Sequence, residues 1–130
     1  PQAFKGDRHH STGIYYLLRS DDFSAFHRIN QDEMWHFYKG NTLILTMISE
    51  EGELSTIRIG NDIGNGEIPQ AVVPKGYWFA AKVEKPESYA LVGCTVTPGF
   101  DFQDFELAER TQLIAEFPQH KDIITSLTRV

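Results

Sequence analysis

The segment FHRINQDEMWHFYKG, residues 26–40, gathers side chains that can transfer protons or bind metal ions. Two histidines, His27 and His36, lie on either side of Glu33, and aromatic residues crowd the second half of the segment. Imidazole and carboxylate groups bind zinc and other first-row metals, and they are also common general acids and bases. The segment therefore predicts a metal site or an acid–base site, with plain core packing as the alternative.

A β-strand must position most of these side chains. After the polar corner NQD, the sequence has the composition of a strand, in which successive side chains point to opposite faces. The two faces are Glu33, Trp35 and Phe37 on one side, and Met34, His36 and Tyr38 on the other. We therefore expect His36 to point away from Glu33 unless a β-bulge intervenes.

The first 102 residues resemble this segment in consisting of short aromatic and β-branched runs. Turn signals separate these runs, including EEGE at 50–53, the Pro-x-Gly turn at 74–76 and KPES at 85–88. Strands that recur at such short spacing favour a sandwich or barrel over β-α-β units. The sequence therefore predicts an all-β fold.

The end of the chain has a different pattern. From about Asp104, helix-forming residues continue to the stop at Pro118, and the apolar residues of HKDIITSLTRV fall on one helical face. We expect one domain over residues 1–130, with the β-strands at about 12–102 and two short helices at about 103–130.

Composition excludes several classes of protein. The chain has 130 residues, a formal charge of −6 and scattered basic residues, which argues against nucleic-acid binding. No apolar run approaches the roughly 20 residues of a membrane-spanning helix. A single cysteine, Cys94, excludes an internal disulfide and is consistent with a reducing compartment, so we expect a cytoplasmic protein. Cys94 itself is expected to be an inert buried thiol.

Two segments contain residues whose types and spacing resemble the metal-binding motifs of the cupins. His27, Glu33 and Gly40 follow the spacing of the first motif, and VVPKGYWF resembles the second. Nearly the whole chain, through TGIYYLL, PQAVVPKGYW and LVGCTVTPGFDFQDFELAER, resembles the fifth cupin family, a domain of unknown function. The resemblance implies a double-stranded β-helix, the jelly-roll barrel of the cupins, assembled as a homodimer.

The chain departs from those motifs at two ligand positions. Ile29 stands where metal-binding cupins carry the second histidine of the first motif, and Phe79 replaces the histidine of the second. Because a first-row metal site needs about three convergent ligands, we expect no tightly bound cofactor. The weak metal candidates are His27, Glu33 and His36, with Gln70 as a further possible ligand.

Without a metal, the resemblance implies acid–base chemistry in an apolar pocket. Burial and mutual pairing would move the proton affinities of His27 and Glu33 toward neutral pH. The resemblance extends to dehydrorhamnose-type sugar epimerases, metal-free jelly rolls in which a histidine removes a proton beside a carbonyl and a tyrosine returns one. His27 would be the base and Glu33 an orienting or second acid–base group. The candidate acids are Tyr16, Tyr38 and Tyr77.

Aromatic and amide side chains would complete a small-molecule site. The candidate ligand-binding residues are Trp35, Phe37, Gln70 and Phe79. Two functions remain open at this point: a metal-independent isomerase or epimerase acting on a carbohydrate-like carbonyl compound, and a non-catalytic barrel that binds such a molecule. His27 and Glu33 could also be a satisfied polar pair with no function.

Overall fold

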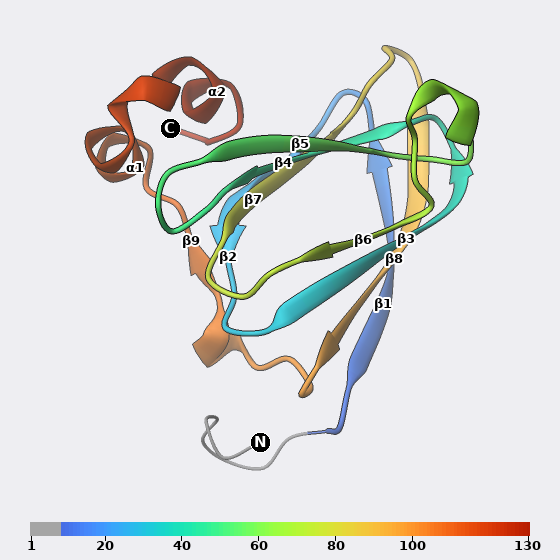
Figure 1. The fold of residues 1–130 in the computed structure, drawn as a ribbon, viewed down its shortest axis with the longest axis horizontal. Helices are drawn as coiled ribbons and strands as arrows, with labels where there is room; N and C mark the ends of the chain where they lie inside the picture. Colours follow the sequence, from blue (N-terminus) through green and yellow to red (C-terminus); the bar gives the residue numbers. More distant parts are fainter. Residues whose placement is uncertain (1–8) are drawn as a thin grey trace.

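The computed structural model describes residues 9–130, in which short aromatic and β-branched runs form two β-sheets (Figure 1). The first sheet has four strands, which lie side by side in the order β1 (Thr12–Arg19), β8 (Tyr89–Thr97), β3 (Asp32–Gly40) and β6 (Gln70–Val73). Every pair of neighbours in this sheet is antiparallel. The order brings β1 and β3 together on β8, although a long stretch of chain separates β8 from both.

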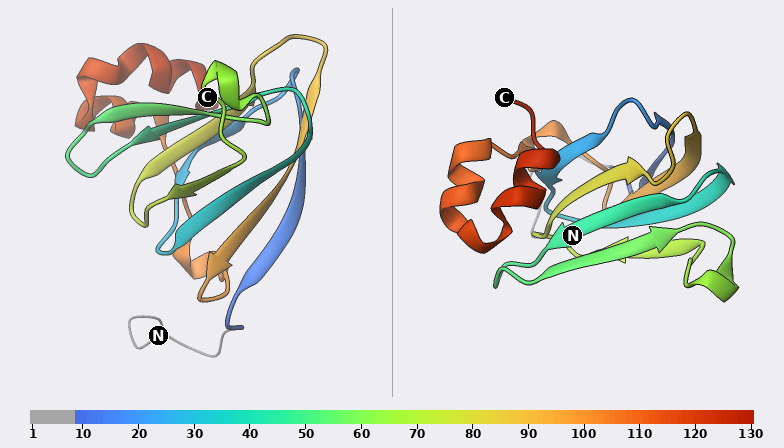
Figure 2. Two further views of the ribbon diagram at one scale, coloured as in Figure 1. Left: turned by 45° about the vertical axis from the view of Figure 1, so that its right-hand side comes forward. Right: turned by 90° about the horizontal axis from the view of Figure 1, so that it is seen from above.

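The second sheet has five strands and faces the first (Figure 2). Its order is β5 (Leu54–Ile59), β4 (Leu43–Ile48), β7 (Trp78–Val83), β2 (Ser24–Arg28) and β9 (Glu106–Leu107). The turn from β4 to β5 contains Gly52, at φ +87°, and the turn from β6 to β7 contains Gly76, at φ +81°. Both glycines stand in the turns that the sequence predicts, where a positive φ disfavours other residues.

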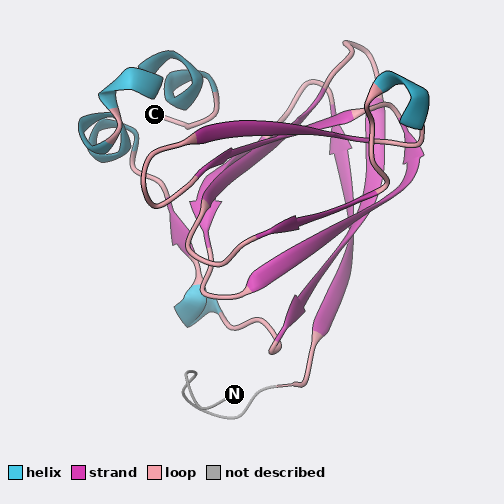
Figure 3. Ribbon diagram, in the orientation of Figure 1, coloured by secondary structure: helices cyan, strands magenta, loops and turns pink. Residues whose placement is uncertain are grey.

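Inward side chains of the two sheets form the main core. It contains large residues from both sheets, among them Trp35 and Val92 of the first sheet, and Leu45 and Phe79 of the second. Their burial follows from the alternation of each strand, because every second side chain points between the sheets. The predicted fold, an all-β cupin-type jelly roll with two short C-terminal helices, is confirmed (Figure 3).

The C-terminal helices pack on the outer side of the second sheet. They are α1 (Arg110–Glu116) and α2 (Lys121–Ser126), joined by the 3₁₀ turn η3 (Pro118–His120). Leu113, Phe117 and Ile124 from this region form a second buried cluster with Phe26 and Trp78 of the sheet. Within residues 9–130, none of the helices combines the length and hydropathy that a membrane-spanning helix requires.

The predicted start of the first helix, at about Asp104, is wrong. A 3₁₀ turn, η2 (Phe102–Asp104), is followed by β9, which pairs with β2 and holds the chain extended. The helix begins at Arg110, where the side chain of Glu109 accepts hydrogen bonds from the backbone N–H groups of Thr111 and Gln112. Strand pairing therefore overrides the helix propensity of this segment.

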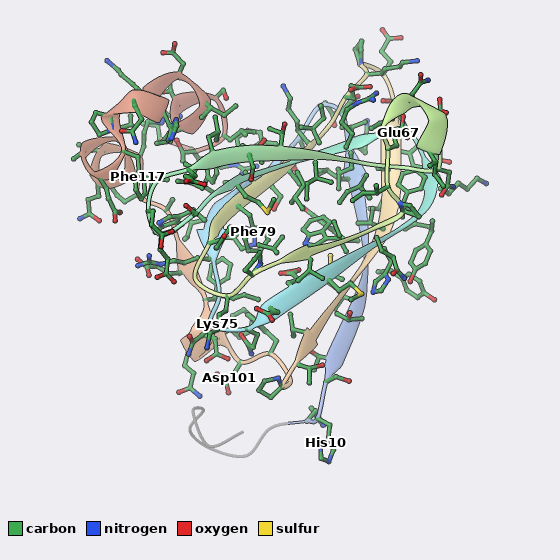
Figure 4. All side chains as sticks on the ribbon, viewed as in Figure 1. His10, Glu67, Lys75, Phe79, Asp101 and Phe117 are labelled. Atoms are coloured by element: carbon green, nitrogen blue, oxygen red, sulfur yellow. The ribbon has the colours of Figure 1, made fainter. Side chains whose placement is uncertain are left out.

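The two sheets differ in what covers their outer faces. The C-terminal helices cover part of the second sheet, whereas the outer face of the first sheet exposes large apolar side chains, including Tyr15, Leu17 and Tyr38. A further 3₁₀ turn, η1 (Ile63–Asn65), lies between β5 and β6. Figure 4 places the neighbouring Glu67 at one end of the molecule and Asp101 near the other.

Candidate functional site

A cavity of about 320 Å³ opens between the two sheets. Strands β1, β2, β3 and β8, the residue that follows β2 and the segment after β8 contribute the side chains that line it. They are Thr12, Ile14, His27, Ile29, Glu33, Cys94, Val96, Phe100 and Phe105. The volume is at the lower end of the range for small-molecule sites, which is about 300–1,000 Å³.

His27 presents a neutral imidazole to this cavity. Its Nδ1 lies 2.8 Å from the carbonyl oxygen of Ala25, and because a carbonyl can only accept, Nδ1 carries the proton and donates it. The ring packs on Phe79 at a centroid distance of 4.1 Å. Burial lowers the pKa of His27, and the hydrogen bond to Ala25 only partly opposes this effect. The unprotonated Nε2 is therefore available as a base at neutral pH.

Glu33 presents a carboxyl group whose proton affinity is shifted in the opposite direction. Burial raises its pKa from the ordinary 4.5 to about 7, while a hydrogen bond with Cys94 works against the shift. Burial also raises the pKa of the Cys94 thiol, and the charge of Glu33 adds to the effect. Glu33 can therefore hold or release a proton near neutral pH, whereas Cys94 remains a thiol.

His27 and Glu33 share the cavity without binding each other. In the part of the chain that the structure describes, the hydrogen bond of the His27 ring goes to Ala25, and no ion pair joins it to Glu33. Each pKa is shifted mainly by burial rather than by the other group. The expected mutual pairing of His27 and Glu33 is therefore not seen among the described residues.

Two predicted ligand-binding aromatics belong to the core beneath the cavity. Phe79 is almost fully buried, lies in the interior of the molecule in Figure 4, and contacts the His27 ring. Trp35 is also buried and meets Phe79 edge to face at 6.3 Å. Neither residue lines the cavity. The Trp35 ring of the first sheet and the Phe79 ring of the second sheet instead pack together in the core between the sheets.

Three other candidates lie on the outer face of the first sheet, away from the cavity. His36 Nε2 lies 3.2 Å from the hydroxyl oxygen of Thr95, and Gln70 Nε2 donates to His36 Nδ1 at 3.4 Å. Tyr38 stacks beside His36 on this face. The register of β3 shifts between Phe37 and Lys39, which is too late in the strand to turn His36 inward. The expectation that Tyr38 and Gln70 serve the pocket is therefore corrected.

Phe37 and the remaining tyrosines are also outside the cavity. Phe37 packs against the core and lines a separate polar hollow that contains Glu67. Tyr16 meets the edge of Trp35 at 6.3 Å, and burial raises its pKa. Tyr77 packs on the core as well. No tyrosine of residues 9–130 lines the cavity, so Glu33 and the thiol of Cys94 are the described acids that line it together with His27.

The donors present do not fit a metal site of the cupin type. Ile29 and Phe79 occupy the two positions where the motifs carry histidines, and both are apolar and buried. Among residues 9–130, no three His, Cys, Asp or Glu side chains are grouped so that they could hold a metal ion. The described side chains therefore do not provide three metal ligands at this cavity.

Several lining residues were not predicted as site residues. Cys94 and Val96 occupy inward positions of β8, which alternation along YALVGCTV could have indicated. Phe100 and Phe105 come from GFDFQDFE, whose three phenylalanines in six residues were the available signal. Their contact with the cavity depends on β9, whose Leu107 pairs with His27.

The two facing antiparallel sheets and the cavity between them define a cupin-type jelly roll. Residues 1–108 match the family described as Cupin superfamily (DUF985). The chain belongs to this cupin family.

Similar proteins extend over much of the chain. The uncharacterized protein YML079W of Saccharomyces cerevisiae is 34% identical over 101 residues, which are 75% of this chain. The match covers 50% of the yeast protein, so the chain spans about half the length of this curated relative.

Solved structures share the fold. Protein SO0799 from Shewanella oneidensis has a TM-score of 0.92 and 46% identity, covering 97% of this chain and 79% of its own. A hypothetical protein from Leishmania major has a TM-score of 0.89 and 32% identity, covering 95% and 78%. A dTDP sugar isomerase from Desulfovibrio desulfuricans, at a TM-score of 0.65 and 12% identity, covers 78% of this chain and 66% of its own, and shares the fold alone.

Proposed function

We propose that the cavity binds a small carbonyl compound and that His27 and Glu33 catalyse its isomerisation or epimerisation without a metal ion. One observation carries the proposal: a neutral imidazole and a carboxyl group with a pKa of about 7 line the same apolar cavity without bonding to each other. Groups with proton affinities near the working pH are efficient general acids and bases. The likeness to a dTDP sugar isomerase supports only the proposal that this fold can carry such a reaction, and it does not indicate a substrate.

The proposed reaction moves protons between carbon, His27 and Glu33. Nε2 of His27 removes a proton from the carbon beside the carbonyl, while the protonated carboxyl group of Glu33 gives its proton to the carbonyl oxygen. The enol that results takes a proton back on carbon and returns the other to Glu33. Return of the carbon proton to the opposite face gives an epimer. Where the carbon beside the carbonyl carries a hydroxyl group, the intermediate is an enediol, and a proton added to the former carbonyl carbon gives an isomer while the other hydroxyl group releases its proton to Glu33.

Exchange with deuterated water tests the reaction. Dihydroxyacetone, fructose and cyclohexanone are incubated with the protein, and deuterium at the carbon beside the carbonyl is measured by NMR. His27→Gln should reduce exchange by about 100-fold or more, and His36→Gln, on the outer face, is the matched control. The rate should fall as the pH rises through about 7, because Glu33 loses the proton that it donates.

A non-catalytic binding cavity is the second candidate function. The observation that favours it is the largely apolar lining, in which Ile14, Ile29 and Val96 offer shape and few groups that orient a substrate. Such a cavity would bind ketones without any deuterium exchange, and His27→Gln would change affinity alone. Binding without exchange over the whole panel would reject the catalytic proposal and retain this one.

We also propose that the protein is a homodimer. The outer face of the first sheet exposes Tyr15 and Leu17, 81% and 59% accessible, together with Tyr38. The corresponding face of the second sheet is partly covered by the helices of the same chain. A second copy of the chain would remove the exposed aromatic surface from water.

A further inference from the structure

The thiol of Cys94 lies beside Glu33 on the inward faces of two paired strands. Trp35 of β3 pairs with Cys94 of β8, and Glu33, two residues before Trp35, points to the same side of the sheet. Glu33 and Cys94 are therefore diagonal neighbours, close enough for their side chains to meet. Both line the cavity, and Cys94 is 5% exposed. The reaction proposed above gives this thiol no part.

A hydrogen bond joins the thiol of Cys94 to the carboxyl group of Glu33. Burial raises the pKa of the thiol, so the sulfur keeps its hydrogen at neutral pH and can donate it. The bond lowers the pKa of Glu33 and raises that of Cys94, which are the directions expected when a thiol donates to a carboxylate. The S–H group is thus the donor, and an oxygen of Glu33 is the acceptor.

This hydrogen bond makes the two carboxyl oxygens of Glu33 unequal. In a protonated carboxyl group one oxygen carries the proton, and the other is a carbonyl oxygen that can only accept. The carbonyl oxygen is the stronger acceptor of the two, so it is the one that faces the S–H group. The proton of neutral Glu33 is therefore held on the oxygen that does not bind Cys94.

We propose that Cys94 is a positioning residue for Glu33: its S–H group holds one carboxyl oxygen and leaves the other to carry the proton that is transferred. The assignment rests on the proposed function, because it concerns the proton that Glu33 gives to the carbonyl oxygen of the ligand. The sulfur itself exchanges no proton with the ligand. A carboxyl group held in one orientation does not have to rotate before the transfer, and a displacement of about 1 Å can lower a rate about 100-fold.

The S–H stretching band tests the hydrogen bond directly, because Cys94 is the one cysteine of the sequence and gives a single band. The band is recorded by infrared spectroscopy on both sides of pH 7. It should move to lower wavenumber as the pH rises through about 7, since ionised Glu33 is a stronger acceptor than the protonated acid. In Glu33→Gln the band should not move with pH. A wild-type band that stays at one wavenumber, or that disappears as the thiol ionises, would overturn the assignment.

Substitutions at Cys94 separate the hydrogen bond from the space that the side chain fills. Cys94→Ser keeps a donor of similar size, and Cys94→Ala removes it. Val92→Ala is the matched control, because it shortens another buried side chain of β8 that belongs to the core and does not line the cavity. Deuterium exchange is measured with the ketone of the panel that the wild type exchanges fastest. It should fall at least about 10-fold in Cys94→Ala, in kcat rather than KM, and stay within about 3-fold of the wild type in the other two variants.

The pH profile of exchange distinguishes positioning of Glu33 from a general effect on packing. The bond to the thiol favours the ionised carboxylate, so its loss should raise the pKa of Glu33. Exchange by Cys94→Ala should therefore decline at a higher pH than exchange by the wild type, whereas Cys94→Ser should decline at the wild-type pH or below it. If Cys94→Ala and Val92→Ala lose exchange equally and keep the wild-type profile, the thiol only fills space and the assignment fails.

The outcomes separate this inference from the proposed function, because the infrared measurement needs no turnover. A band that follows the ionisation of Glu33 while no ketone exchanges deuterium rejects catalysis and retains the orientation of Glu33 by Cys94. Exchange that Cys94→Ala leaves unchanged supports catalysis and overturns the role of Cys94. A band that is independent of Glu33 overturns that role whatever the exchange measurements give.

Discussion

At the scale of single residues, the site depends on burial that acts on an acid and a base in opposite directions. Removal from water disfavours the charged form of each group, so the pKa of His27 falls and the pKa of Glu33 rises. The result is a neutral base beside a group that is partly protonated at neutral pH. A histidine and a glutamate on the surface would not show these opposite shifts, because water would keep the pKa of each group near its ordinary value.

The raised pKa of Glu33 predicts a pH dependence of stability. Between 4.5 and about 7 the folded protein holds a proton on Glu33 that the unfolded chain has released. The free energy of unfolding should therefore fall by up to about 3 kcal/mol as the pH rises through this window, and this contribution should be constant above it. His27, with its lowered pKa, contributes the opposite slope below pH 6.5.

Urea denaturation of the wild type and of Glu33→Gln at several pH values isolates the contribution of Glu33. The difference between the two should shrink or reverse toward alkaline pH, since glutamine does not titrate. Glu51→Gln, at an exposed position in the turn from β4 to β5, is the control. Parallel pH curves for the wild type and Glu33→Gln would show that Glu33 is not buried as described.

The two missing motif histidines predict the effect of restoring them. Ile29→His combined with Phe79→His should add two metal ligands beside His27 and Glu33 and raise the affinity for zinc or manganese above that of the wild type. Calorimetry with the metal salts measures the change, and Ile29→Gln with Phe79→Leu is the matched control. A double histidine variant that binds no more metal than the wild type would show that these positions do not correspond to the motif.

At the scale of elements, the β3–β8 pairing sets which side chains reach the cavity. Glu33 pairs with Val96, and Trp35 pairs with Cys94. Because side chains alternate along both strands, all four of these side chains point between the sheets. Gly40 closes this pairing at the end of β3, with φ +104°. A Cβ atom there would collide with the backbone carbonyl oxygen of Tyr89. Gly40 is therefore needed for backbone approach as well as for its φ.

Substitution of Gly40 should reveal that close contact. Gly40→Ala should lower the free energy of unfolding by at least about 2 kcal/mol more than Gly66→Ala. Gly66 also has a positive φ, +82°, but a Cβ atom there would meet nothing within 4 Å. Gly66→Ala therefore measures only the cost of placing alanine at a positive φ, without a steric clash. Urea denaturation of both variants provides the comparison. Equal losses would mean that the strand ends can separate without cost.

At the scale of the whole molecule, the uneven cover of the two sheets predicts self-association. Light scattering at micromolar concentration should give a mass twice that of one chain. Tyr15→Lys with Leu17→Lys should give a monomer, because two charges would have to be desolvated in the interface. Ile63→Lys, at a position 69% exposed in η1, is the control and should remain dimeric. A monomeric wild type would reject the homodimer.

The sequence by itself determined the strands of the first 102 residues, their faces and the turn glycines. Alternation is a local property of extended backbone, so the inward position of Glu33 and the outward position of His36 followed from residues 32–40 alone. The spacing of His27 and Glu33 resembles the first cupin motif, and this resemblance predicted that the two residues line one cavity, as they do.

Only the tertiary structure decided which other residues complete the cavity. Tyr16 and Trp35 point inward as alternation allows, yet packing between the sheets places them in the core and leaves the cavity to Cys94, Phe100 and Phe105. The extended course of β9 was also hidden, because its pairing partner lies about eighty residues earlier in the chain. Contacts between distant segments select among the positions that local pattern permits, and they also set the burial that shifts each pKa.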